Sequence, residues 1–294
     1  MTSVDSTDPG RTETVWEVRL PAGATLLEIA ADLLWSAGAT AVEERSTSSG
    51  MIAVASTPSE AAARSIAGAL AELVGDRLDG IGPVEVERRE VAMRELWRDH
   101  TRWRRLTPRI AVGPVWIEPP TCAQRVAIEP AGSFGLGDHP TTALVAGELL
   151  RLIRPGDRVV DLGTGSGTLA ILAAISGAVR VVGIDIAPAA VEAARSNAVR
   201  AEVSHLIDVV LDGTGEHARN AFPEGADLVV ANILAPEIAA LAPAIESAAA
   251  RDGRVILSGF PERRISSVLA AFPDWTESRR CLCGAWAAVT IRRR

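Results

Sequence analysis

The sequence of 294 residues contains neither lysine nor tyrosine, so all 30 of its Lys-plus-Arg positions are arginine. Lysine Schiff bases, lysine-dependent phosphate loops and tyrosine nucleophiles are therefore excluded from its chemistry. Aromatic residues are also scarce, at 4%, whereas hydrophobic residues reach 48%. A hydrophobic fraction near one half supports a folded core, and the length predicts about two domains.

Cysteine is rare as well, with only Cys122, Cys281 and Cys283. An odd number in a chain of this length argues against a disulfide framework. The 4 histidines show no recognisable metal-ligand spacing, so we expect no metal site.

Long apolar runs are missing too. No stretch reaches the ~18 residues that a membrane span requires, so we expect no membrane partner. Residues 1–13 contain neither the basic nor the apolar region of a signal peptide. We therefore predict a disordered tail over residues 1–13 and a cytoplasmic location.

Charge is unevenly distributed along the chain. Residues 1–90 carry 7 arginines against 15 acidic residues, residues 91–125 carry 7 against 3, and residues 126–294 carry 16 against 19. An acidic N-terminal region could attract a basic partner and would repel nucleic acid, so nucleic acid is not the expected partner. A solvated acidic surface explains the same composition without any partner.

Residues 14–91 show alternating and helical apolar patterns in turn. The resulting order β-α-β-β-α-β is typical of a small α+β, ferredoxin-like domain. The predicted strands are residues 16–20, 41–45, 51–55 and 84–87, and the predicted helices are residues 26–37 and 61–74.

Residues 92–125 are predicted to be a partly helical linker. Arginines recur there every three to four residues, which would place them along one side of a helix. Basic residues interleaved with tryptophan can contact RNA, but a helix that packs its Trp side against a domain explains them as well, and we favour packing. The residues concerned are Arg94, Trp97, Arg98, Arg102, Trp103 and Arg105.

From residue 126 to residue 294, short apolar segments alternate with helical ones. This alternation predicts an α/β, doubly wound and mainly parallel sheet. The predicted strands are residues 158–162, 180–185, 206–211, 226–231, 254–257 and 285–291, and helices are predicted to begin near Thr141, Thr168, Pro188, Pro236 and Glu262.

A glycine-rich loop follows the first of these strands, with Asp161 and then Gly163, Gly165 and Gly167. Such glycines permit a tight turn and close approach of the backbone to a nucleotide-type ligand. A dinucleotide fingerprint would have glycine at position 168, where the chain has Thr168. The pattern suits S-adenosylmethionine instead, with Asp161 near the methionine ammonium group.

Asp185 ends the next strand, about 20 residues after the loop, where a carboxylate can accept both ribose hydroxyls. A helix-capping acid is the alternative interpretation of Asp185. Both classes of nucleoside cofactor use such an acid, so Asp185 indicates a nucleoside without choosing between them.

Asn232 follows the fourth strand and should face the same crevice, because ligands of open α/β sheets lie beyond the carboxyl ends of the strands. Its amide could orient an incoming amine, whereas a turn-forming asparagine is the alternative. Upstream, residues 132–142 form a glycine-rich segment in which Thr142 could reach the cofactor or cap a helix. His139 could act as a general base or only shape the loop.

These motifs together resemble the bacterial ribosomal protein L11 methyltransferase (PrmA) family. The resemblance rests on Phe-Gly-x-Gly-x-His-Pro-Thr-Thr at 134–142, Asp-x-Gly-x-Gly-Ser-Gly at 161–167, Gly-Ile-Asp-Ile at 183–186 and Asn-Ile-Leu-Ala at 232–235. It implies a Rossmann-like class I methyltransferase sheet and contacts to S-adenosylmethionine from Thr142, Gly163, Asp185 and Asn232. It also implies that residues 14–91 recognise the protein substrate.

The implied activity is transfer of methyl groups to amino groups of a protein, either lysine side chains or the N-terminal amine, with ribosomal protein L11 as the expected substrate. Another protein lysine is one alternative. An RNA or small-molecule methyltransferase is a second, and a nucleoside-binding module or an NAD oxidoreductase belongs to a different class.

Overall fold

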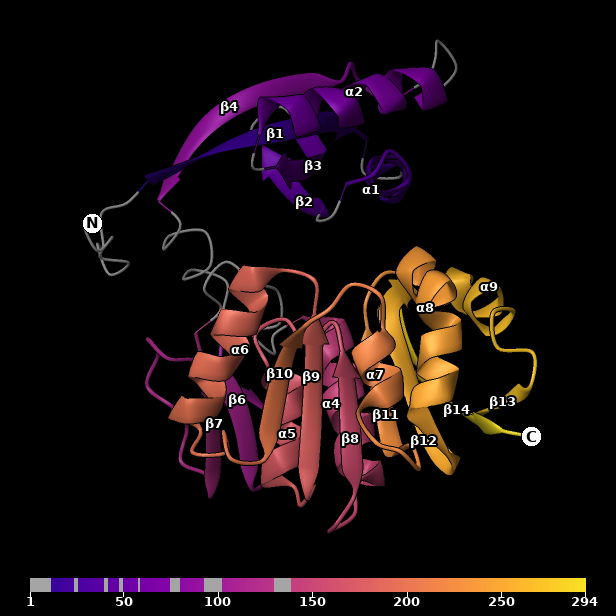
Figure 1. Ribbon diagram of the computed structural model, residues 1–294. Helices are drawn as coiled ribbons and strands as arrows, with labels where there is room; N and C mark the ends of the chain where they lie inside the picture. The colour runs from indigo at the N-terminus through magenta and orange to yellow at the C-terminus, as the bar shows by residue number, and fades with distance from the viewer. Residues whose placement is uncertain are drawn as a thin grey trace, which may run out of the picture. The chain divides into compact units, whose positions relative to one another are not determined.

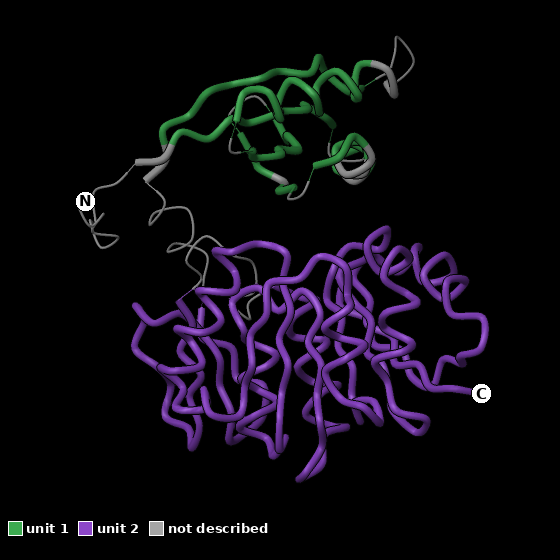
Figure 2. The backbone as a smooth tube through the Cα atoms, in the orientation of Figure 1, with its two compact units in different colours: residues 1–100 green, residues 101–294 purple. Residues whose placement is uncertain are grey.

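The computed structural model describes residues 12–23, 26–39, 42–47, 50–57, 59–74, 80–92, 102–129 and 139–294. The chain divides into two compact units, residues 1–100 and residues 101–294 (Figure 2). Among the described residues, no helix has the length and apolar character needed to span a membrane. The first strand begins at Thr12, so the predicted tail is two residues too long, and residues 1–11 lie outside the described part of the chain.

The first unit has the predicted element order (Figure 1). Its sheet has the strand order β2-β3-β1-β4 with antiparallel neighbours, as in the split βαβ arrangement. Val18 and Leu20 alternate with charged residues along β1, and these two apolar side chains form one core with both helices. The elements are β1 (Thr12–Ala22), α1 (Leu27–Ser36), β2 (Val42–Thr47), β3 (Gly50–Thr57), α2 (Glu60–Val74) and β4 (Glu85–Ala92).

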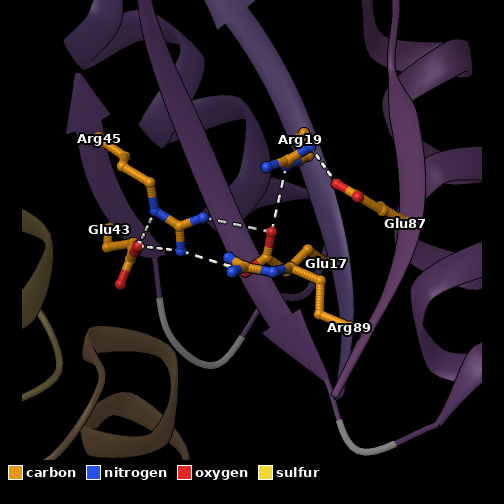
Figure 3. A network of polar contacts seen from close by, with 6 residues as sticks. All are labelled: Glu17, Arg19, Glu43, Arg45, Glu87 and Arg89. Atoms are coloured by element: carbon orange, nitrogen blue, oxygen red, sulfur yellow. Dashed lines mark hydrogen bonds and ion pairs between the residues drawn. The ribbon is translucent and has the colours of Figure 1, made fainter. Parts of the chain in front are cut away.

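Glu17 lies on the opposite face of this sheet, buried beneath three arginines (Figure 3). Its carboxylate accepts hydrogen bonds from Arg45 at 3.1 and 3.3 Å and from Arg89 at 3.2 Å. The Nε atom of Arg19 lies 3.1 Å from the same carboxylate. These arginines come from three different strands, so one buried acid ties β1, β2 and β4 together. The outer acids of the network are Glu43 and Glu87.

Replacing Glu17 by glutamine is expected to lower the free energy of unfolding of the first unit by about 1–2 kcal/mol, because the buried charge-assisted hydrogen bonds are lost. The matched control is Glu60→Gln, which removes an exposed pair with Arg64 on α2. Such exposed pairs contribute about 0.3–0.5 kcal/mol. Hydrogen exchange of the β1 amides in the full chain measures both effects, and equal losses would contradict the structural role of Glu17.

The second unit contains a seven-stranded sheet of order β10-β9-β8-β11-β12-β14-β13. Its first five strands run parallel, and β14 runs antiparallel to both of its neighbours. Helices cover both faces (Figure 1). Val159 belongs to the core that includes side chains of α4, α5 and α6, whereas the next residue, Val160, belongs to the core that includes side chains of α7, α8 and α9. The prediction of an α/β, doubly wound sheet is confirmed.

The helices of this unit begin close to their predicted positions, since proline in the first turn marks α4, α6 and α8. In the seven-stranded sheet and its covering helices, the short helix α7 and the edge strand β13 were not among the predicted elements. The elements are α4 (Pro140–Leu152), β8 (Arg158–Leu162), α5 (Thr168–Ile175), β9 (Arg180–Asp185), α6 (Pro188–Arg200), β10 (Ile207–Leu211), α7 (Glu216–Asn220), β11 (Ala226–Asn232), α8 (Ala235–Ala248), β12 (Ala249–Pro261), the 3₁₀ turn η1 (Glu262–Arg264), α9 (Ile265–Leu269), β13 (Trp275–Cys283) and β14 (Trp286–Arg293).

A separate three-stranded sheet precedes α4 in this unit, formed by β5 (Arg104–Arg105), β6 (Ile110–Pro114) and β7 (Gln124–Ile128). The predicted arginine helix is therefore wrong at Arg105, which lies in β5. The Nε1 atom of Trp103 donates a hydrogen bond to the Ile117 carbonyl at 2.8 Å, and its ring lies against Gly113. Trp103 thus packs within the unit, while Arg94, Trp97 and Arg98 lie outside the described residues.

Candidate active site

The glycine loop connects β8 to α5, and backbone hydrogen bonds join it to the end of β9. Gly163, Gly165 and Gly167 have φ values of +71°, +54° and +82°, which favour glycine. The amides of Gly163 and Thr164 donate to the Ile184 carbonyl at 2.8 and 2.9 Å. The structure therefore brings the predicted loop residues to the carboxyl end of two neighbouring parallel strands.

Ile233 is held between two glycines that are far apart in the sequence. A Cβ atom on Gly163 would lie 2.2 Å from Cγ2 of Ile233, and one on Gly259 would lie 2.2 Å from the Ile233 carbonyl oxygen. Both contacts are too close for any side chain, so both positions require glycine. The residue directly after Asn232 is fixed in this way, and with it the direction in which the chain leaves β11.

Replacing Gly163 by alanine is expected to destabilise the second unit by about 2 kcal/mol, since backbone strain at positive φ adds to the displacement of Ile233. Gly156 has a φ of +93° but no neighbour within 4 Å of an added Cβ. Gly156→Ala is therefore the control and should cost about 1 kcal/mol through strain alone. Urea denaturation of the full chain measures both changes. Adding Ile233→Ala should recover part of the Gly163→Ala loss, and no recovery would argue against the contact.

Asp161 is buried below the loop. Its Oδ2 atom accepts a hydrogen bond from the Thr164 hydroxyl at 2.8 Å, while its Oδ1 atom has no hydrogen-bond partner. Burial and, to a smaller extent, the negative charge of Asp185 raise the pKa of this carboxyl group from 3.8 to about 6. The hydroxyl of Thr164 and the backbone N–H of Ala170 act in the opposite direction on the pKa. The site thus contains an acid whose charge depends on pH near neutrality.

Both carboxylate oxygens of Asp185 accept hydrogen bonds from backbone amides. Oδ2 accepts from the Gly165 amide and Oδ1 from the Ala187 amide, each at 2.9 Å. Ala187 is the N-cap residue of α6, and no side chain caps this helix, so the bond to Ala187 does not make Asp185 a helix-capping acid. Each oxygen has a second lone pair, which leaves room for further donors. Asp185 therefore organises the glycine loop, and its contact with ribose stays a prediction.

Asn232 and Thr142 meet although 90 residues separate them. The Nδ2 atom of Asn232 lies 3.5 Å from the Thr142 hydroxyl oxygen, at the long end of hydrogen bonding. The Oδ1 atom of Asn232 is buried and has no partner. Thr142 is itself buried in the first turn of α4. An acceptor oxygen at the carboxyl end of β11 is thus available to a ligand.

His139 caps α4. Its Nδ1 atom accepts a hydrogen bond from the Thr141 amide at 3.3 Å and lies 2.7 Å from the Thr141 hydroxyl. Its ring lies edge-on to Trp286, with centroids 4.9 Å apart. These contacts give His139 a local structural role, and nothing in them supports a general base. The preceding residues of the predicted loop, 132–138, lie outside the described residues.

Two features of this region were not predicted from the sequence. Ile186, which directly follows β9, is 74% exposed, and Leu211, the last residue of the neighbouring strand β10, is 51% exposed. Exposed apolar side chains beside Asp185 are suited to contact with a flat apolar group.

In the described part of the chain, no group of three or more His, Cys, Asp or Glu side chains could hold a metal ion.

The strand order with its reversed β14, the glycine loop after β8 and the acid at the end of β9 define the chain as a class I methyltransferase fold. It is similar to the crystal structure of ribosomal protein L11 methylase from Lactobacillus delbrueckii subsp. bulgaricus, with a TM-score of 0.59 and 28% identity, over 65% of this chain and 98% of that one. Residues 14–294 match the family described as "Ribosomal protein L11 methyltransferase (PrmA)", and the chain belongs to this family.

Two curated relatives carry the same description. The chain is 39% identical over 201 residues to the ribosomal protein L11 methyltransferase of Symbiobacterium thermophilum, covering 66% of this chain and 64% of the relative. It is 34% identical over 205 residues to that of Heliobacterium modesticaldum, covering 67% and 62%. The matching segment thus spans less than two thirds of either relative.

Proposed function

We propose that the chain is an S-adenosylmethionine-dependent protein methyltransferase that modifies amino groups of ribosomal protein L11. The observation that carries this proposal is the convergence of Gly163, Asp185 and Asn232 at the carboxyl ends of β8, β9 and β11 in a member of this family. The names of the relatives support the substrate. The modified groups are lysine side chains, the N-terminal amine or both.

The residues present fit S-adenosylmethionine. Two buried oxygens, Oδ1 of Asp161 and Oδ1 of Asn232, have no protein partner and suit a ligand that brings a cation and hydrogen-bond donors. Asp185 and the glycine backbone would hold the nucleoside, with Thr142 beside Asn232. When bound, S-adenosylmethionine supplies a sulfonium methyl group, which an amine lone pair accepts as the carbon–sulfur bond breaks to leave a thioether.

The chain's own contribution is orientation. Asn232 offers an acceptor that can align an amine N–H and leave the nitrogen lone pair directed at the methyl group. Alignment supplies most of the acceleration in such a reaction, since the donor is already activated. The amine must be neutral, and burial favours this because desolvation lowers the pKa of a lysine from its ordinary ~10.4. The proton leaves to solvent, and we assign no residue as a general base.

Residues 14–91, which lie within the first unit, are proposed to recognise the protein substrate. Its excess of acidic residues suits a basic protein and would repel nucleic acid. The packing of Trp103 within the second unit gives this half-buried side chain a structural role that does not need RNA. A cytoplasmic location follows from this proposed substrate and stays a prediction.

Incubation of the full chain with S-adenosylmethionine and purified ribosomal protein L11, followed by intact-mass spectrometry, tests the proposal. We expect mass increases in steps of one methyl group, and peptide mapping then locates them. Isothermal titration with S-adenosylmethionine and, separately, NAD tests the cofactor. Binding of S-adenosylmethionine without methylation of L11 would overturn the substrate, and binding of NAD alone would overturn the activity.

A further inference from the structure

Asn197 is a fully buried amide on α6 that lies outside the set of predicted site residues. Its Nδ2 group donates to the carbonyl oxygens of Ser166 at 2.9 Å and Glu129 at 2.8 Å. Its Oδ1 atom accepts from the Glu129 amide at 2.9 Å and from the Arg200 guanidinium at 2.6 Å. Both hydrogens and both lone pairs of the amide are therefore used.

These bonds connect the glycine loop to two other elements. Ser166 lies within the loop, and Glu129 directly follows β7. One helical turn before Asn197, Ala194 touches Gly167, where an added Cβ would lie 3.0 Å from the Ala194 backbone. Helix α6 thus meets the loop at two consecutive residues, by packing at Gly167 and by a hydrogen bond at Ser166. The second contact fixes the orientation of the peptide between these two residues.

We propose that Asn197 is a positioning residue that sets the conformation of the glycine loop, and thereby the affinity for the cofactor, without touching the cofactor. The identity of the ligand rests on the proposed function, whereas the link between Asn197 and the loop does not. Without this amide, the Ser166 carbonyl would lose the hydrogen bond from Asn197, which costs enough free energy to shift the loop. The loop amides that approach the ligand would then lose their alignment.

The test uses Asn197→Asp in the full chain. Aspartate has the same shape, but it places an oxygen atom opposite the carbonyls of Ser166 and Glu129, where asparagine has two N–H donors. We expect the KM for S-adenosylmethionine to rise about tenfold, as the loss of roughly 1.4 kcal/mol predicts. The value of kcat at saturating cofactor should change by less than about twofold, because the binding of the amine is unaffected. Asn197→Ala, which adds no charge, should shift KM in the same direction.

Two controls separate positioning from stability. Arg200→Ala removes one donor to Asn197 but leaves both carbonyl bonds, so KM should stay unchanged. Val268→Ala removes buried volume from α9, on the other side of the sheet, and should lower the melting temperature without changing KM. Wild-type KM in Asn197→Asp, or an equal rise in Val268→Ala, would overturn the proposal.

Hydrogen exchange over residues 163–167, without ligand, provides a second measurement. Exchange should be faster in both Asn197 variants and unchanged in Arg200→Ala and Val268→Ala. If wild-type protein fails to bind S-adenosylmethionine, the proposed function fails, but this exchange experiment still decides whether Asn197 positions the loop. Unchanged exchange in the Asn197 variants would refute the proposal whatever the ligand.

Discussion

Replacing Asn232 by alanine is expected to lower kcat for methyl transfer to ribosomal protein L11 by about 10²-fold, because a small loss of alignment at the reacting atoms has effects of this size. Its Oδ1 atom is the buried acceptor without a partner at the end of β11. Ile233, the next residue, is held by Gly163 and Gly259, so the position of Asn232 cannot readily adjust. Steady-state rates at saturating S-adenosylmethionine measure the effect.

One further variant tests which atom of Asn232 matters, and another serves as a control. Thr142→Val removes the hydroxyl that lies 3.5 Å from Nδ2 but leaves Oδ1 in place, so its effect on kcat should be several-fold smaller. Asn220→Ala changes an exposed asparagine on α7 and should leave the rate unchanged. A rate within threefold of wild type for Asn232→Ala would rule out its role in orienting the amine.

Replacing Asp161 by asparagine is expected to stabilise the second unit above pH 6 by about 3 kcal/mol relative to wild type, with no gain below pH 4. The pKa of Asp161 is raised from 3.8 to about 6 by burial, so the folded state holds the proton more tightly than the unfolded state. This contribution to stability is fully present below the unfolded pKa and is lost as the pH rises through the folded pKa. Above that value the wild-type protein must bury a charge.

Urea denaturation of the full chain between pH 4 and pH 8, compared between wild type and Asp161→Asn, measures this difference. Thr164→Val supplies a control in the opposite direction, because the Thr164 hydroxyl donates to Asp161 and lowers its pKa. In Thr164→Val, which lacks this donor, the pKa of Asp161 should be higher, so stability should be lost over a higher pH range than in wild type. A difference between wild type and Asp161→Asn that does not vary with pH would show that Asp161 does not titrate in this range.

Much of the fold and the candidate site could be predicted because their signals are local. Proline in the first turn marks the beginning of α6, and the apolar segment before Gly163 marks β8. The carboxyl ends of parallel strands meet at one edge, so Asp185 and the glycine loop were expected together and are joined by a hydrogen bond at 2.9 Å. The substrate-recognition role of the first unit and the cofactor contacts stay predictions.

Other features could not be predicted because they depend on partners distant in the sequence. The strands β6 and β7 are each only five residues long. The spacing of arginine and tryptophan just before them is typical of a helix, so the sequence predicted a helix there. The capping role of His139 is visible only in its bond to Thr141. Asn197 lies in an ordinary amphipathic helix, and only the approach of α6 to the loop shows what its amide does.

The sequence alone determined the absence of lysine and tyrosine, the order of strands and helices in the first unit, and the positions of the glycines and acids at the ends of the strands. Composition and periodicity are properties of the chain itself. Burial was decided only by the tertiary structure. It makes Asp161 a weak acid, leaves an oxygen of Asn232 without a partner and places Ile233 between two glycines. The physical reason is that desolvation and close packing depend on which distant segments meet, and no local pattern encodes them.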